Sequence, residues 1–202
     1  GVKVGHLCHR SCLVACRWSG RPTTTVEEGR VISDNLWVGK LVRLTGFSKE
    51  DARTFSGWHN DAGFLRLVDA AVARPRAEDE ILKWFEEWQK SERTLAFAVR
   101  PLDSDRMVAF VSLEDILWSH GVAWLGIGIG DRDEWGKGYG RDAMSLVLSY
   151  AFHELNLHRV QLTVFEYNER AIALYEKVGF RREGVYREFM RREGRRYDMY
   201  LY

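Results

Sequence analysis

The stretch LGIGIGDRDEWGKGYG, residues 125–140, decides the fold that this sequence predicts. It holds six of the 18 glycines in a chain of 202 residues. In its first part, Leu125-Gly126-Ile127-Gly128-Ile129-Gly130, bulky apolar residues alternate with glycine. This period of two is typical of a strand, and here it leaves one face of the strand almost bare of side chains. A bare face would let an extended ligand lie against the backbone, so the segment predicts a strand that contacts a ligand.

The second part, Trp135-Gly136-Lys137-Gly138-Tyr139-Gly140, predicts an anion site. It lies just before a helical pattern at 144–155. Glycines let backbone N–H groups approach a ligand closely, and the start of a helix adds partial positive charge. We therefore expect a pyrophosphate group to bind here, with Lys137 and Arg141 adding positive charge.

Two other phosphate-binding loops fit this stretch less well. A Walker loop needs Ser or Thr after the lysine, but Gly138 follows Lys137. A dinucleotide fingerprint, G-x-G-x-x-A, does occur at 138–143, and Glu166 follows at a suitable distance. However, a polar stretch separates these glycines from their strand, and the chain is short for further parallel units. Dinucleotide binding therefore stays a minor alternative.

The patterns on either side of this stretch predict one mixed α/β domain over residues 36–202. Residues 61–76 carry no clear pattern. Strands are expected at 38–44, 95–99, 107–113, 122–129 and 160–164, helices at 48–60, 77–90, 144–155 and 171–178, and a closing hairpin at 180–189 and 197–202.

Residues 1–35 are expected to form a flexible extension. All three cysteines lie there, at Cys8, Cys12 and Cys16. A zinc site would need further ligands that the rest of the chain does not supply as cysteines, so no metal is expected. The lack of cysteine after residue 16 argues against a disulfide framework and favours a reducing compartment, the cytoplasm.

The charge balance excludes some broad classes of protein. Thirty Lys and Arg oppose 29 Asp and Glu, so the net charge of +1 gives no reason to expect binding to nucleic acid or to a membrane surface. No apolar stretch reaches the roughly 18 residues of a spanning helix, so a membrane protein is not expected.

Two separated blocks resemble one family. The run at 135–140 is similar to the Q/R-x-x-G-x-G/A motif of the GNAT family of N-acetyltransferases, with Trp135 where the general motif has Gln or Arg. The segment 168–180, NERAIALYEKVGF, resembles that family's N-x-x-A-x-x-L-Y-x-x-x-G-F block. Their order and spacing are similar to those of the branch that acetylates ribosomal-protein N-termini and polyamines.

The resemblance implies a mostly antiparallel sheet of about seven strands and four helices, with strands four and five, 122–130 and 159–166, splayed apart. It implies acetyl-CoA as the co-substrate and a primary amine as the acceptor, either a protein N-terminus or a polyamine-like molecule. The protein would be a monomer or a homodimer. The residues expected to bind the cofactor are Gly128, Ile129, Gly130, Trp135, Gly136, Lys137, Gly138, Tyr139, Gly140 and Asn168.

By the same resemblance, the Tyr175 hydroxyl would protonate the departing CoA thiolate. Glu166 is the candidate base for the amine, directly or through water, and Glu114 and Asp115 are others. Because charged side chains are mostly exposed, each of these carboxylates is expected to be solvated. A non-catalytic protein that binds CoA with the same fold stays open as the alternative function.

Overall fold

The computed structural model describes residues 35–202. The three cysteines and almost all of the predicted extension lie outside the described residues. Within residues 35–202, no helix is both long and apolar enough to cross a membrane.

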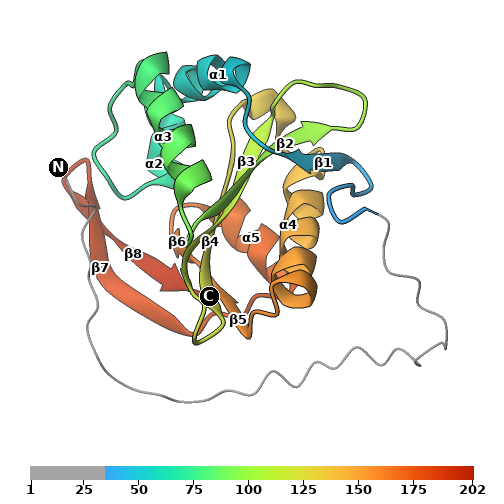
Figure 1. Cartoon of the computed structure of the whole chain (residues 1–202). Helices are drawn as coiled ribbons and strands as arrows, with labels where there is room; N and C mark the ends of the chain where they lie inside the picture. The colour runs from blue at the N-terminus through green and yellow to red at the C-terminus, as the bar shows by residue number, and fades with distance from the viewer. Residues whose placement is uncertain (1–34) are drawn as a thin grey trace. The chain divides into compact units, whose positions relative to one another are not determined.

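Eight strands of the described chain form two sheets (Figure 1). The larger sheet has the order β1-β2-β3-β4-β5 and is antiparallel except for its last pair. The smaller sheet has the order β6-β8-β7 and is antiparallel throughout. The strands are β1 Val42–Thr45, β2 Leu95–Pro101, β3 Ala109–Leu117, β4 Val122–Ile129, β5 Arg159–Gln161, β6 Thr163–Phe165, β7 Gly184–Arg192 and β8 Arg195–Leu201.

Five α-helices cover the larger sheet, as Figure 1 shows. The first three helices pack together and contact β2 and β4. The fourth helix contacts β1, β3 and β4, and it also packs against the fifth helix. They are α1 Lys49–His59, α2 Ala62–Val68, α3 Glu78–Lys90, α4 Tyr139–Ser149 and α5 Glu169–Val178. The predicted mixed α/β fold with a mostly antiparallel sheet is confirmed, with one more strand and one more helix than expected.

The two sides of the larger sheet bury different side chains. Under α1 and α3 the core is aromatic, with Phe55, Trp58 and Phe85 buried. Around α4 it is aliphatic, with Met144 and Val147 fully buried. The structure thus has one core on each face of the sheet.

Local sequence signals correctly predicted where several elements begin or end. Asp51 accepts a hydrogen bond from the Ser48 backbone N–H at 2.7 Å, which stabilises the start of α1. Gly179 ends α5 with a φ of 106°, a conformation that favours glycine. The unassigned stretch contains α2, whose first turn is capped by Asp61 through a 2.7 Å bond from the Gly63 N–H.

The predicted splay between the central strands is confirmed. β4 and β5 run parallel but pair only from Val122–Trp124 to Arg159–Gln161. At Leu162 the chain leaves β4 and bonds instead with Tyr202, and β6 continues along β8. The single strand expected at 160–164 is therefore two strands. Beyond Trp124, β4 keeps one edge that no other described strand pairs with.

Candidate active site

The glycine face of β4 is not bare. A Cβ atom at Gly126 would lie 2.8 Å from Ser112 Oγ, and one at Gly128 would lie 2.5 Å from Phe110 Cε1. At Gly130 it would overlap the indole ring of Trp58. The expectation that a ligand lies on this face is therefore wrong, because neighbouring side chains of the chain itself fill the space. Cofactor contact by Gly128, Ile129 and Gly130 stays a prediction for the unpaired strand edge.

Trp135 closes one end of that edge. The Gly130 N–H donates to the Val108 carbonyl on the β3 side at 3.3 Å. In a planar trans peptide the preceding carbonyl points the opposite way, so the Ile129 oxygen faces the unpaired edge. There it accepts a hydrogen bond from Trp135 Nε1 at 3.0 Å. Trp135 thus fixes the loop to the strand, which explains a tryptophan at this position of the motif.

The loop before α4 presents backbone N–H groups. Gly136 and Gly138 have φ values of 79° and 91°, in the left-handed region that favours glycine. Gly138 is the N-cap of α4, and no side chain caps this helix end. The first turn therefore offers free N–H groups and the positive end of the helix dipole, as an anion site requires.

Lys137 is paired within the loop. Its Nζ lies 2.9 Å from Glu134 Oε2, and Arg106 binds the other oxygen of the same buried carboxylate. The hydrogen bonds from Lys137 and Arg106 lower the pKa of Glu134, and its carboxylate in turn raises the pKa of Lys137. Much of the positive charge that the sequence assigned to the anion is balanced by Glu134, whose role the sequence did not indicate.

Two other arginines lie near this helix start without a carboxylate partner among residues 35–202. Arg141 is exposed in the first turn of α4. Arg170, in the first turn of α5, places its guanidinium 4.8 Å from the centre of the Trp135 ring. No local sequence pattern indicates Arg170, because the starts of α4 and α5 meet only in the folded structure.

Asn168 forms two contacts within the chain. Its Oδ1 accepts a hydrogen bond from the Ala171 N–H at 3.2 Å and so caps α5. Its Nδ2 donates to the Leu67 carbonyl at 3.2 Å, which ties α5 to the end of α2. Cofactor contact by Asn168 stays a prediction, and the residue has a structural role besides.

The end of α2 is tied further to the C-terminal strands. The Tyr167 hydroxyl donates to the Arg66 carbonyl at 2.7 Å, and Arg66 pairs with Glu193 at 2.7 Å. The Arg192 guanidinium donates to the Asp69 carbonyl at 3.1 Å. We call these contacts the hairpin clasp, because Arg192 and Glu193 lie at the β7–β8 turn.

Tyr175 lies buried in the aliphatic core, and burial raises the pKa of its hydroxyl to about 12. The hydroxyl has no hydrogen-bond partner in the described part of the chain. A phenol with so high a pKa is fully protonated at neutral pH.

The three candidate bases differ in their surroundings. Asp115 is exposed and lies 3.5 Å from Arg93. Glu166 is half-buried, and its side chain makes no contact with another described polar group. Glu114 is half-buried and accepts a 2.6 Å hydrogen bond from Ser112 Oγ. Burial raises the pKa of Glu114, so the expectation that all three carboxylates are simply solvated is wrong for this residue.

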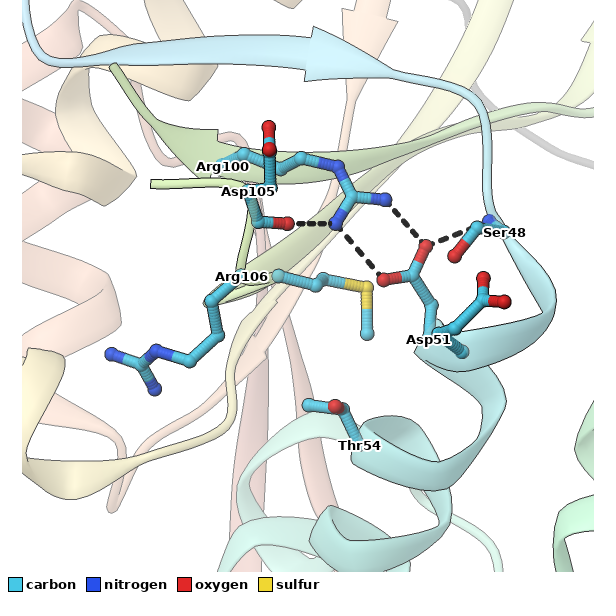
Figure 2. A pocket seen from close by; sticks show the side chains of 8 residues that line it. Ser48, Asp51, Thr54, Arg100, Asp105 and Arg106 are labelled. Atoms are coloured by element: carbon cyan, nitrogen blue, oxygen red, sulfur yellow. Dashed lines mark hydrogen bonds and ion pairs between the residues drawn. The ribbon is translucent and has the colours of Figure 1, made fainter. Parts of the chain in front are cut away.

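A separate hollow of about 410 Å³ lies at the start of α1 (Figure 2). Arg100 spans it and donates to both carboxylate oxygens of Asp51, at 3.0 and 2.6 Å. None of the predicted site residues lines it. Its central charges are paired with each other, which is typical of a structural ion pair rather than of a binding site.

Within residues 35–202, no cluster of three or more His, Cys, Asp or Glu side chains is arranged to hold a metal ion.

Known proteins are similar to this chain in sequence and in fold. Residues 42–181 match the family model described as Acetyltransferase (GNAT) domain. The uncharacterised N-acetyltransferase YoaA of Bacillus subtilis is 25% identical over 77% of this chain and 81% of its own. The uncharacterised N-acetyltransferase p20 of Bacillus licheniformis is 29% identical over 52% of this chain, a match that spans only 59% of p20. The crystal structure of a Vibrio cholerae spermidine N-acetyltransferase with CoA and spermine has a TM-score of 0.72, with 26% identity over 79% of this chain and 92% of its own.

Proposed function

The chain belongs to the GNAT acetyltransferase family and is an acyltransferase, and from this premise we propose that it transfers the acetyl group of acetyl-CoA to a primary amine. The observation that carries the proposal is the unpaired edge of β4, which is followed, after the loop at 130–138, by an uncapped helix start. An extended pantetheine arm fits the first, and a pyrophosphate fits the second.

The acceptor that we propose is a small polyamine-like amine. The similar Vibrio cholerae structure is of a spermidine N-acetyltransferase with spermine bound, which supports a flexible polycation. A protein N-terminus is the second acceptor to test, because it presents the same amine chemistry. The cytoplasm is the proposed location, on the evidence of the cysteine distribution.

In the proposed mechanism the amine attacks the thioester carbon directly. The C–N bond forms, the C–S bond breaks, and the Tyr175 hydroxyl protonates the CoA thiolate. At neutral pH the Tyr175 hydroxyl holds its proton, as a general acid must before the C–S bond breaks.

The test is a panel of polyamines and N-terminal peptides, with CoA release and mass spectrometry as readouts. We expect acetylated spermidine, and a Tyr175→Phe variant with kcat reduced about 100-fold at an unchanged KM for acetyl-CoA. A protein that binds CoA but acetylates no amine would be the non-catalytic alternative. A large rise in the KM for acetyl-CoA in Tyr175→Phe would assign the residue to cofactor binding or packing instead.

A further inference from the structure

The side chains that pack over the glycine face of β4 change from aromatic to polar along the strand. Trp58 lies over Gly130, and Phe110 and Phe64 lie over Gly128. Over Gly126 lie Ser112 and Glu114: a Cβ there would be 3.2 Å from Glu114 Oε1. Gly126 is two residues beyond Trp124, the last residue that pairs with β5. A carboxylate is therefore held beside the point where the two strands part.

This carboxylate is held in position. Ser112 is fully buried, and its hydroxyl donates to Glu114 Oε1 at 2.6 Å. No described residue bonds to the second oxygen of Glu114. The side chain thus has one oxygen fixed by the protein and one left for a donor from outside.

The charges that face Glu114 are acidic. Asp115 follows it on β3, and Asp69 lies at the end of α2, and both raise the pKa of Glu114 in addition to the larger effect of burial. Arg93 pairs with Asp115 rather than with Glu114. A half-buried carboxylate without a cation, next to further carboxylates, attracts a positively charged ligand.

We propose that Glu114, positioned by Ser112, binds the ammonium group of the acceptor and takes its proton. This inference rests on the proposed acetyltransferase function. One N–H proton passes from the ammonium to the Glu114 carboxylate, and the free amine then attacks the thioester. Tyr175 protonates the thiolate and regains a proton from the nitrogen of the collapsing intermediate. Glu114 returns its proton to solvent.

Glu166 is the rival base. It follows β6, which pairs with β8 in the smaller sheet, and no described residue orients its carboxylate. A base must be held within hydrogen-bond reach of the nucleophile, and only Glu114 of the two is held by a buried partner. Replacing each carboxylate separately distinguishes them.

The experiment compares Glu114→Gln with Glu166→Gln, the rival base, and with Glu86→Gln on the exposed side of α3 as the matched control, using spermidine and acetyl-CoA. We expect Glu114→Gln to lower kcat/KM for the amine about 100-fold at an unchanged KM for acetyl-CoA, and the control to stay within about twofold. CoA affinity and thermal unfolding show that each variant is folded. A full effect in Glu166→Gln with none in Glu114→Gln would overturn the inference.

Ser112→Ala tests the positioning role. The Ser112 hydroxyl stabilises the charged carboxylate and so lowers the pKa of Glu114. We expect its removal to shift the acidic limb of the profile of kcat/KM against pH to higher pH, which a purely structural defect would not do. An unshifted limb would show that Ser112 does not act on the base.

Failure of the proposed function is separable from failure of this inference. If the wild-type protein binds CoA but acetylates no amine, the proposed function is wrong. In that case calorimetry with spermidine and the CoA-loaded protein tests whether Glu114 binds the ammonium group. A loss of spermidine affinity in Glu114→Gln would support this binding role, and unchanged affinity would overturn it.

Discussion

The segment 125–130 repeats a bulky apolar residue followed by glycine three times. The space over the two resulting faces of β4 is filled in opposite ways. On one face Leu125, Ile127 and Ile129 supply their own bulk and pack toward α4. On the other, the glycines supply none, and Trp58, Phe110 and the Ser112–Glu114 pair fill the space from other elements. A glycine on a strand therefore shows only that something comes close to the backbone. Whether this is a ligand or the chain itself depends on segments far away in the sequence.

The largest expected effect comes from a substitution that disrupts the packing over the glycine face of β4. Gly130→Ala would place a methyl group inside the Trp58 ring, which is buried and enclosed by Phe55 and Phe64. We expect the free energy of unfolding to fall by about 3 kcal/mol in urea denaturation. Gly57→Ala in α1 is the control, because nothing lies within 4 Å of its added methyl group, and we expect it to gain up to about 1 kcal/mol. Equal stabilities of the two variants would refute the packing account.

The same substitution on the α4 side should have a smaller effect. A Cβ at Gly140 would lie 3.2 Å from Ile129 Cδ1 and 3.3 Å from Leu174 Cδ2. Both atoms are ends of flexible side chains, and alanine also favours the helix. We expect a change within about 1 kcal/mol of the wild type in the same denaturation experiment. A loss as large as that of Gly130→Ala would mean that this face is equally rigid.

The smallest expected effect concerns the polar end of the glycine face. Burial raises the pKa of Glu114 above its ordinary value of 4.5, so ionisation of Glu114 destabilises the folded state as pH rises through the raised pKa. Glu114→Gln carries no charge and keeps an oxygen for Ser112. We expect it to be slightly more stable than the wild type at pH 7, and this difference to vanish below pH 4.5.

Urea denaturation at both pH values measures that difference, and a variant less stable at pH 7 would contradict it. Together with the activity assay, the result separates a residue kept for function from one kept for packing. A carboxylate that weakens the fold at neutral pH needs a functional reason to be there.

Most of the fold could be predicted from the sequence because the signals for its elements are local. Alternation identified β4, Ser48 and Asp51 marked the start of α1, and Gly179 marked the end of α5. The helix α2 was missed because seven residues are too few to show a helical period. The break at Leu162 was missed because it depends on pairing with Tyr202, forty residues away.

The site was predicted only in part for the same physical reason. Gly136 and Gly138 could be assigned to a loop before a helix, because their conformation is local. The pairing of Lys137 with Glu134 and Arg106, and the contact of Arg170 with Trp135, depend on how distant elements meet. The half-burial of Glu114 is likewise set by packing and not by its neighbours in sequence.

The hairpin clasp has a consequence for how the molecule is made. The Tyr167 hydroxyl binds the Arg66 carbonyl across 101 positions, and Arg66 pairs with Glu193 across 127. During synthesis the first three helices leave the ribosome long before these partners exist. Contacts so distant in sequence form late, because a long loop must close before they contribute stability. The end of α2 is thus among the last parts of the chain to be fixed, and a nascent chain truncated before β7 would lack Arg192 and Glu193, which hold it.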